Sequence, residues 1–163
     1  MSRRYPLQTL LKLRAHRTET ARLEVLARQR VVAACRDECT RIGDEITELQ
    51  RTRAAQRSRL LDPPSPGLSW PMVMEQREAH IELLAAHVLA GQQRLQAAQG
   101  RLREAEQALE QAKQAYFRAK GREDALEKRK RLWRDEQIAL EINREEDAAA
   151  DLILARHATS GHS

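Results

Sequence analysis

Two cysteines and two histidines are the side chains in this sequence whose spacing could support metal or redox chemistry. Cys35 and Cys39 lie four residues apart and His80 and His87 lie seven apart, so each pair would share one helix face. A structural zinc site takes about four ligands, and no further Cys or His pair completes one here. Both cysteines also fall where helix packing needs small apolar side chains. We therefore expect no metal site.

A basic run within residues 122–134 is the next candidate, because clustered Lys and Arg side chains can bind nucleic acid. Acidic residues interrupt and follow this run, namely Glu123, Asp124, Glu127, Asp135 and Glu136. Alternating charges on a helix are typical of a solvated face with pairs four residues apart. We expect no nucleic-acid partner; the alternative, a nucleic-acid-binding rod, predicts binding that weakens steeply with salt.

Motifs for catalysis and cofactor binding are missing from the sequence. It has no glycine-rich phosphate loop, no plausible nucleophile–base pair and no dinucleotide fingerprint. Long paired helices also offer no concave pocket that excludes water. We therefore expect a protein that is not an enzyme, with no catalytic residues and no cofactor.

The composition favours long helices over a compact globular core. Charged residues make up 33% of the chain and aromatic residues only 3%. Residues 1–61 carry 14 Lys or Arg and 7 Asp or Glu, against 15 and 17 in the remainder, so the first part is basic. No apolar run reaches the roughly 18 residues of a membrane-spanning helix, and no apolar stretch follows the basic start as in a secretory signal. We expect a cytoplasmic protein without direct membrane insertion.

The five prolines divide the chain, because they lie at positions 6, 63, 64, 66 and 71 and nowhere else. Proline costs about 3 kcal/mol inside a helix, so the proline-free stretches are expected to be helical. We predict a basic arm over 1–6, a first helix over 7–62, a proline-rich turn over 63–71, a second helix over 72–157 and a disordered tail over 158–163. Ser69 is the expected N-cap of the second helix, with Pro71 in its first turn.

Both predicted helices carry a heptad seam, in which steps of four and three residues alternate. From Leu7 to Leu60 the seam has sixteen positions, of which eleven are apolar, and from Met74 to Leu140 it has twenty, of which fifteen are apolar. Seams of this length indicate a coiled coil. From Val88 to Ala119 the second seam alternates large and small residues, which lets a partner helix approach closely. We predict an all-α fold, a long two-helix antiparallel coiled-coil hairpin whose second helix is the longer.

The length difference leaves part of the second helix without a partner. Folding back from the turn, the first helix ends opposite about Leu126, so residues 127–157 are expected to overhang and either bind something or fray. At the turn, Trp70 with Met72 and Met74 suits an adaptable binding surface. The alternative for Trp70 and Met74 is local packing onto Leu60 and Leu61.

The order of these elements resembles a known family. A short basic start leads into Leu7–Arg14, a proline break leads to Trp70, and the stretch from Ala125 to Arg134 precedes the acidic residues 145–147. Together they resemble the central stalk proteins of bacterial type III secretion systems, the YscO/SctO family, and their flagellar relative FliJ. The resemblance covers nearly the whole chain.

The resemblance implies a stalk between a hexameric secretion ATPase and a membrane export-gate protein, at the cytoplasmic face of the inner-membrane secretion apparatus. It also implies contacts with export chaperones, and we expect a monomer when the protein is free. The export-gate-binding residues would be Trp70, Gln76, His80, Leu83 and His87. The ATPase-binding residues would be Arg3, Arg4, Leu7, Leu11, Arg129, Trp133 and Arg134. The flagellar pattern has an aromatic residue after the Trp, where this sequence has Met72, Val73 and Met74.

A second hypothesis is a generic coiled-coil adaptor or a prefoldin-like chaperone subunit. Such a protein would use the ends of its helices as a clamp and would need no ATPase. A stable homo-oligomer favours this hypothesis, whereas a monomer favours the stalk.

Overall fold

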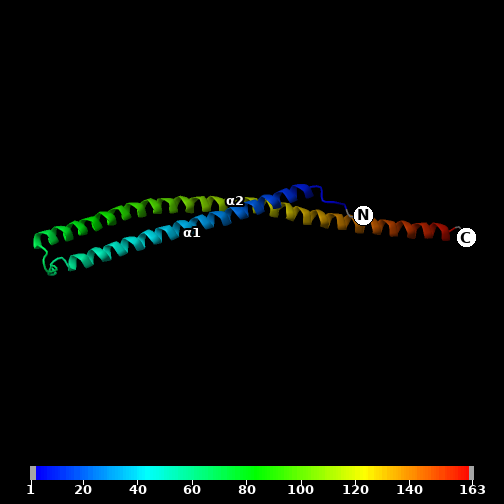
Figure 1. The fold of residues 1–163 in the computed structure, drawn as a ribbon. Helices are drawn as coiled ribbons and strands as arrows, with labels where there is room; N and C mark the ends of the chain where they lie inside the picture. Colours follow the sequence, from blue (N-terminus) through cyan, green and yellow to red (C-terminus); the bar gives the residue numbers. More distant parts are fainter. Residues whose placement is uncertain (1–2, 162–163) are drawn as a thin grey trace. The chain divides into compact units, whose positions relative to one another are not determined.

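The computed structural model describes residues 3–161, and within that range it contains two helices and no strand. Helix α1 spans Gln8–Ser58 and helix α2 spans Trp70–Ser160. The helices pack against each other as a hairpin, with α2 longer than α1 (Figure 1). The predicted all-α hairpin with a longer second helix is therefore confirmed.

Contacts within the chain group into two units. The turn unit comprises Glu24–Lys113, with the last part of α1, the turn and the first part of α2. The terminal unit comprises Met1–Leu23 with Gln114–Ser163.

The core of the turn unit follows the predicted seams. Ile42, Ile46, Val88 and Ala98 form one buried cluster, and Cys39, Leu49 and Leu95 pack against it. The cysteine therefore serves as a small apolar side chain between the helices, as its seam position predicts. Each fully buried aliphatic side chain contributes about 1.5–3 kcal/mol, so this cluster is a main source of stability for the unit.

Close helix contact in this unit depends on the small seam residues. Ala98 is 1% exposed, Ala105 and Ala112 are also buried, and Gly91 lies in the same series of buried positions. A Cβ atom added at Gly91 would lie 2.9 Å from Cγ1 of Ile46, closer than van der Waals contact permits. The alternation of large and small residues therefore brings α2 close to α1 at this level of the hairpin.

Three ion pairs cross between the helices of the turn unit. Arg94 lies 3.4 Å from Glu45, Arg101 lies 3.0 Å from Glu38, and Arg36 lies 3.8 Å from Glu106. The six side chains keep between 38% and 65% of their surface exposed, so solvent screens the pairs and they add little stability. From pair to pair, the residue number falls on α1 as it rises on α2, as one antiparallel register requires. The buried apolar cluster sets the same register.

The turn between the helices depends on one proline and one glycine. In the sequence Ser65-Pro66-Gly67-Leu68, the Leu68 N–H donates to the Ser65 carbonyl at 3.2 Å. Gly67 has a φ of 86°, the left-handed value that the third residue of a type II turn requires. Proline in the second position fixes its own φ at the value that this turn needs, so Pro66 and Gly67 together reverse the chain.

The terminal unit buries a different set of side chains. Leu11 of α1 is 4% exposed and Thr18 is 8% exposed. The Thr18 hydroxyl donates to the Arg14 carbonyl one turn earlier, which removes the penalty of burying it. Tyr5, which precedes α1, is also buried, at 8% exposed.

The helix ends differ from the predicted boundaries by a few residues. Helix α1 ends at Ser58 rather than at position 62. The chain continues in tighter turns, in which the N–H groups of Leu60 and Asp62 donate to the carbonyls of Arg57 and Arg59, three residues earlier. Helix α2 begins at Trp70 rather than at Met72, with Pro71 in its first turn as predicted and the Val73 N–H donating to the Ser69 carbonyl. It continues to Ser160, so the predicted disordered tail is helical up to that residue. His162 and Ser163 lie outside the described residues.

The predicted overhang from Glu127 is wrong in its starting point. Lys130, Trp133 and Gln137 are half-buried, and continuous exposure begins only at Ile138 and runs to Gly161. The prediction assumed that α2 has a partner only along the length of the first helix. The arm before α1 also packs against α2. Tyr5 on that arm contacts Trp133 and so extends the paired region.

Candidate functional site

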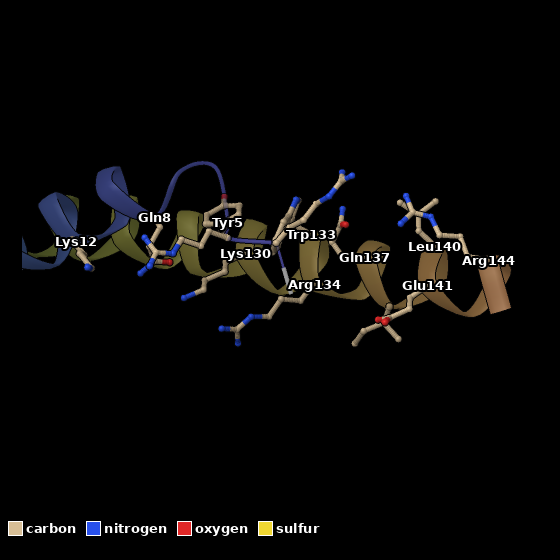
Figure 2. A pocket seen from close by; sticks show the side chains of 13 residues that line it. Tyr5, Gln8, Lys12, Lys130, Trp133, Arg134, Gln137, Leu140, Glu141 and Arg144 are labelled. Carbon is tan, nitrogen blue, oxygen red and sulfur yellow. The ribbon is translucent and has the colours of Figure 1, made fainter. Parts of the chain in front are cut away.

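A groove in the terminal unit is the first candidate site. The arm before α1, the first turns of α1 and the later part of α2 line it, over a volume of about 790 Å³. Tyr5 lies against Trp133, with ring centroids 5.6 Å apart and an interplanar angle of 55°. Figure 2 shows these two rings together, with Gln8 and Lys12 of α1 beside the arm. The tilted aromatic pair holds the arm on α2.

The groove is strongly basic. Six of its lining side chains are Lys or Arg and one is acidic, Glu141; the basic ones are Arg3, Arg4, Lys12, Lys130, Arg134 and Arg144. These cations come from the arm and from both helices, so their charges add at one surface. Such a surface favours a partner that carries carboxylates or other anions.

The structure brings together four of the seven predicted ATPase-binding residues. Arg3, Arg4, Trp133 and Arg134 all line the groove. Leu7 is half-buried and Leu11 is buried, so these two leucines support the helix packing and offer little contact surface. Arg129 is exposed but does not line the groove.

The prediction missed several groove residues. Tyr5 stands between the basic start and Pro6. An aromatic residue in this place was the one sequence feature that could have indicated that the arm packs against a helix. Lys12 and Arg144 carry ordinary helix-surface spacing, so nothing in the sequence separated them from other exposed cations. Lys130 falls on the second predicted seam and is half-buried. Their convergence depends on the register between the arm and α2.

The start of α2 carries the second candidate site. All five predicted export-gate residues are exposed, and four of them are Gln76, His80, Leu83 and His87. Their spacing of four, three and four residues places them on one face of α2. Leu83 is 53% exposed, so this face, here called the gate stripe, presents an apolar side chain between two histidines.

Trp70, the fifth predicted residue, has a different environment. It is 43% exposed, and its ring lies 5.9 Å from the guanidinium carbon of Arg77. Leu61, Leu68 and Met72 are exposed around the turn. The alternative, local packing of Trp70 and Met74 onto Leu60 and Leu61, stays a prediction. Arg77 lies three residues after Met74 on the second predicted seam, and nothing in the sequence indicated its contact with Trp70.

The electrostatics of the terminal unit are dominated by pairs within one helix. The hydrogen bond from Arg22 lowers the pKa of Glu19 below its ordinary value, and the same bond raises the pKa of Arg22. The hydrogen bond to Asp124 raises the pKa of Lys120, with a smaller effect from Glu123. These pairs fit the solvated helix surface that the alternating charges predict.

Residues 3–161 hold no group of three His, Cys, Asp or Glu side chains placed to bind a metal ion. In the same range, no helix is long and apolar enough to cross a membrane. The two free cysteines are half-buried.

Comparisons with known proteins agree on one family and one fold. A family model described as "YscO-like protein" matches residues 2–156. A solved structure from Chlamydia trachomatis, of a protein described as a YscO homologue, matches with a TM-score of 0.79 and 17% sequence identity, covering 99% of each chain. This second likeness concerns the fold. No protein with a curated description matches the sequence significantly.

Proposed function

Because the chain belongs to the YscO-like family, a family of type III secretion components, we propose that it is the non-enzymatic central stalk of a secretion system. In this role it links the hexameric export ATPase to the membrane export gate. The match over residues 2–156 is the observation that carries the proposal, since it includes both candidate surfaces.

The basic groove of the terminal unit is the proposed ATPase-binding surface. Arg3, Arg4 and Arg134 line it, and Trp133 fixes the arm through Tyr5. A stalk that contacts a ring of subunits needs a charged, hydrated surface more than a deep pocket, because its contacts must form and break. Leu7 and Leu11 support this surface through helix packing, and Arg129 adds an exposed positive charge on α2.

The gate stripe and Trp70 in the turn unit are the proposed export-gate-binding surface. An exposed Leu83 between His80 and His87 gives an apolar contact with polar flanks, the usual build of a small interface. Trp70 adds an aromatic side chain of the type enriched at binding hot spots. Export chaperones are further proposed partners, and the protein acts at the cytoplasmic face of the inner-membrane apparatus.

The test is to combine the purified protein with the ATPase of its own secretion system. We expect faster ATP hydrolysis and a larger hexamer fraction with the wild type than with a variant in which Arg3, Arg4 and Arg134 are glutamines. Absence of binding and of stimulation by the wild type would refute the stalk. Light scattering of the free protein adds a second criterion, because the stalk predicts a monomer and an adaptor or prefoldin-like subunit predicts a stable oligomer.

A further inference from the structure

Arg77 connects the turn, the end of α1 and the start of α2. Its Nη1 atom donates towards three backbone carbonyls, at 2.7 Å from Asp62, 2.9 Å from Leu60 and 3.3 Å from Arg59. All three acceptors lie just beyond the last residue of α1, Ser58. The side chain therefore bridges 15 to 18 residues of sequence at the point where the chain reverses.

The Arg59 carbonyl also accepts from the Asp62 N–H at 3.1 Å, so an external donor matters most for the Leu60 and Asp62 carbonyls. These carbonyls follow the C-terminal end of α1, which the helix dipole makes electronegative. The prolines at 63, 64 and 66 have no N–H group that could satisfy these carbonyls from the turn. A guanidinium from the other helix supplies both the hydrogen bonds and the positive charge.

The same guanidinium also contacts Trp70. Its central carbon lies 5.9 Å from the ring centroid, within the range of a cation–π interaction. Trp70 is the first residue of α2 and Arg77 follows seven residues later, so the two side chains share one face of the helix. The ring keeps 43% of its surface exposed. One guanidinium thus joins the exposed indole to the backbone that ends α1.

We propose that Arg77 is a positioning residue, which holds the indole of Trp70 in its partly exposed orientation for partner binding. This inference rests on the proposed function for its partner, the export-gate protein, but the orientation of the ring is a property of the free chain. A lysine would keep the positive charge near the carbonyls, but it lacks the planar group that bonds several acceptors while lying over a ring.

The experiment uses the full chain with Trp133→Phe, so that Trp70 is the remaining tryptophan. In this background Arg77→Lys and Arg77→Met are compared with Arg103→Met, which removes an exposed arginine elsewhere on α2. Melting followed by circular dichroism measures the hairpin. Tryptophan emission and acrylamide quenching measure the environment of the indole.

We expect Arg77→Lys to melt close to the parent and yet to show a shifted Trp70 emission and quenching about twofold stronger, since the ring loses its planar partner. Arg77→Met should show the same optical change with a lower melting temperature. Arg103→Met should match the parent in every measurement. Unchanged emission and quenching in both Arg77 variants would overturn the proposal.

Binding to the cytosolic part of the export-gate protein then separates positioning from general stability. Arg77→Lys should weaken binding on the order of tenfold, as Trp70→Ala does, and combining the two should add little. An equal loss from Arg77→Lys in the Trp70→Ala background would show that Arg77 acts by another route and refute the proposal. If the parent chain itself does not bind the gate, the proposed function fails, while the optical data still decide the role of Arg77.

Discussion

Glycine at position 91 differs from the other helical glycines in what surrounds it. A methyl group at Gly91 would meet Ile46 at 2.9 Å, whereas the space around Gly43 and Gly121 is open to at least 4 Å. Glycine inside a helix costs about 1 kcal/mol relative to alanine, so a glycine retained at a tight contact trades helix stability for close packing. The same residue type therefore has opposite energetic effects at positions 91 and 43.

Alanine substitutions at these glycines should move stability in opposite directions. Gly43→Ala should stabilise the chain by about 0.5–1 kcal/mol, because it gains helix propensity without a contact. Gly91→Ala should destabilise it, since overpacking of about 1–3 kcal/mol exceeds that gain. Urea unfolding at equal protein concentration measures both. A Gly91→Ala variant as stable as Gly43→Ala would show that Ile46 can move aside, and the close approach would not be required.

Tyr5 gives a second prediction at this scale, because its hydroxyl is buried and makes no hydrogen bond within residues 3–161. Tyr5→Phe should be neutral or slightly stabilising, since it removes an unsatisfied polar atom and keeps the ring on Trp133. Tyr5→Ala should cost about 3 kcal/mol of local stability by analogy with buried aromatic truncations. Limited proteolysis near residues 3–7 would report release of the arm. Equal cleavage rates in the two variants would contradict the packing role of the ring.

At the scale of the helices, the apolar pattern was enough to predict the architecture. Of the predicted seam positions, only Arg28 in α1 and Leu140 in α2 are exposed. The reason is that helix pairing follows the 3.5-residue apolar period, which is a local property of sequence. The proline positions likewise placed the turn, although the helix ends moved by two to four residues.

The candidate sites were less predictable, because they depend on which residues meet. The Tyr5–Trp133 contact joins two residues that no repeat relates, and the groove cations depend on that contact. Arg77 occupied a seam position, where a charged residue reads as a packing defect. Its hydrogen bonds to the turn follow from how the turn folds, which Pro66 and Gly67 determine, and not from its own neighbours in sequence.

The last part of α2 supports a prediction about this helix as an element. Every residue from Ile138 to Gly161 is exposed, so this stretch is held by helix propensity alone. Most helical stability in proteins comes from tertiary packing, and a helix without tertiary contacts opens easily. Hydrogen exchange should therefore be much faster at residues 142–160 than in the buried cluster around Ile46. A chain that stops after Glu141 should melt at nearly the same temperature as the full chain.

The control for this truncation lies in the paired region. A chain that stops after Lys128 also loses Trp133, the partner of Tyr5, and should lose arm packing and part of its melting temperature. Equal protection across residues 130–160, or a large loss on cutting after Glu141, would mean that the exposed stretch is stabilised by contacts such as self-association.

At the scale of the whole molecule, a protein that links two partners needs two binding surfaces, and a change that weakens one should leave the other intact. The proposed ATPase-binding groove is lined by six basic residues and one acidic residue, whereas the gate stripe has an exposed leucine between two histidines. Ionic contacts weaken as salt screens them, and apolar contacts do not. Raising the salt concentration should therefore weaken ATPase binding far more than gate binding.

Paired variants then test whether the two surfaces serve one function. Replacing Arg3, Arg4 and Arg134 with glutamine should weaken ATPase binding on the order of tenfold or more and leave gate binding unchanged. Replacing Leu83 with serine and His87 with alanine should do the reverse, since both side chains are exposed. Circular dichroism melting of each variant confirms that the helices still form.

Secretion measured in cells that lack the native gene decides between a link and two unrelated contacts. If the protein couples the ATPase to the gate, each variant set alone should reduce secretion, because a link broken at either surface transmits nothing. Co-expressing the two variant sets should not restore secretion, because one molecule must carry both intact surfaces. Restoration by the mixture would show that the two contacts act separately in different molecules, and the coupling role would have to be abandoned.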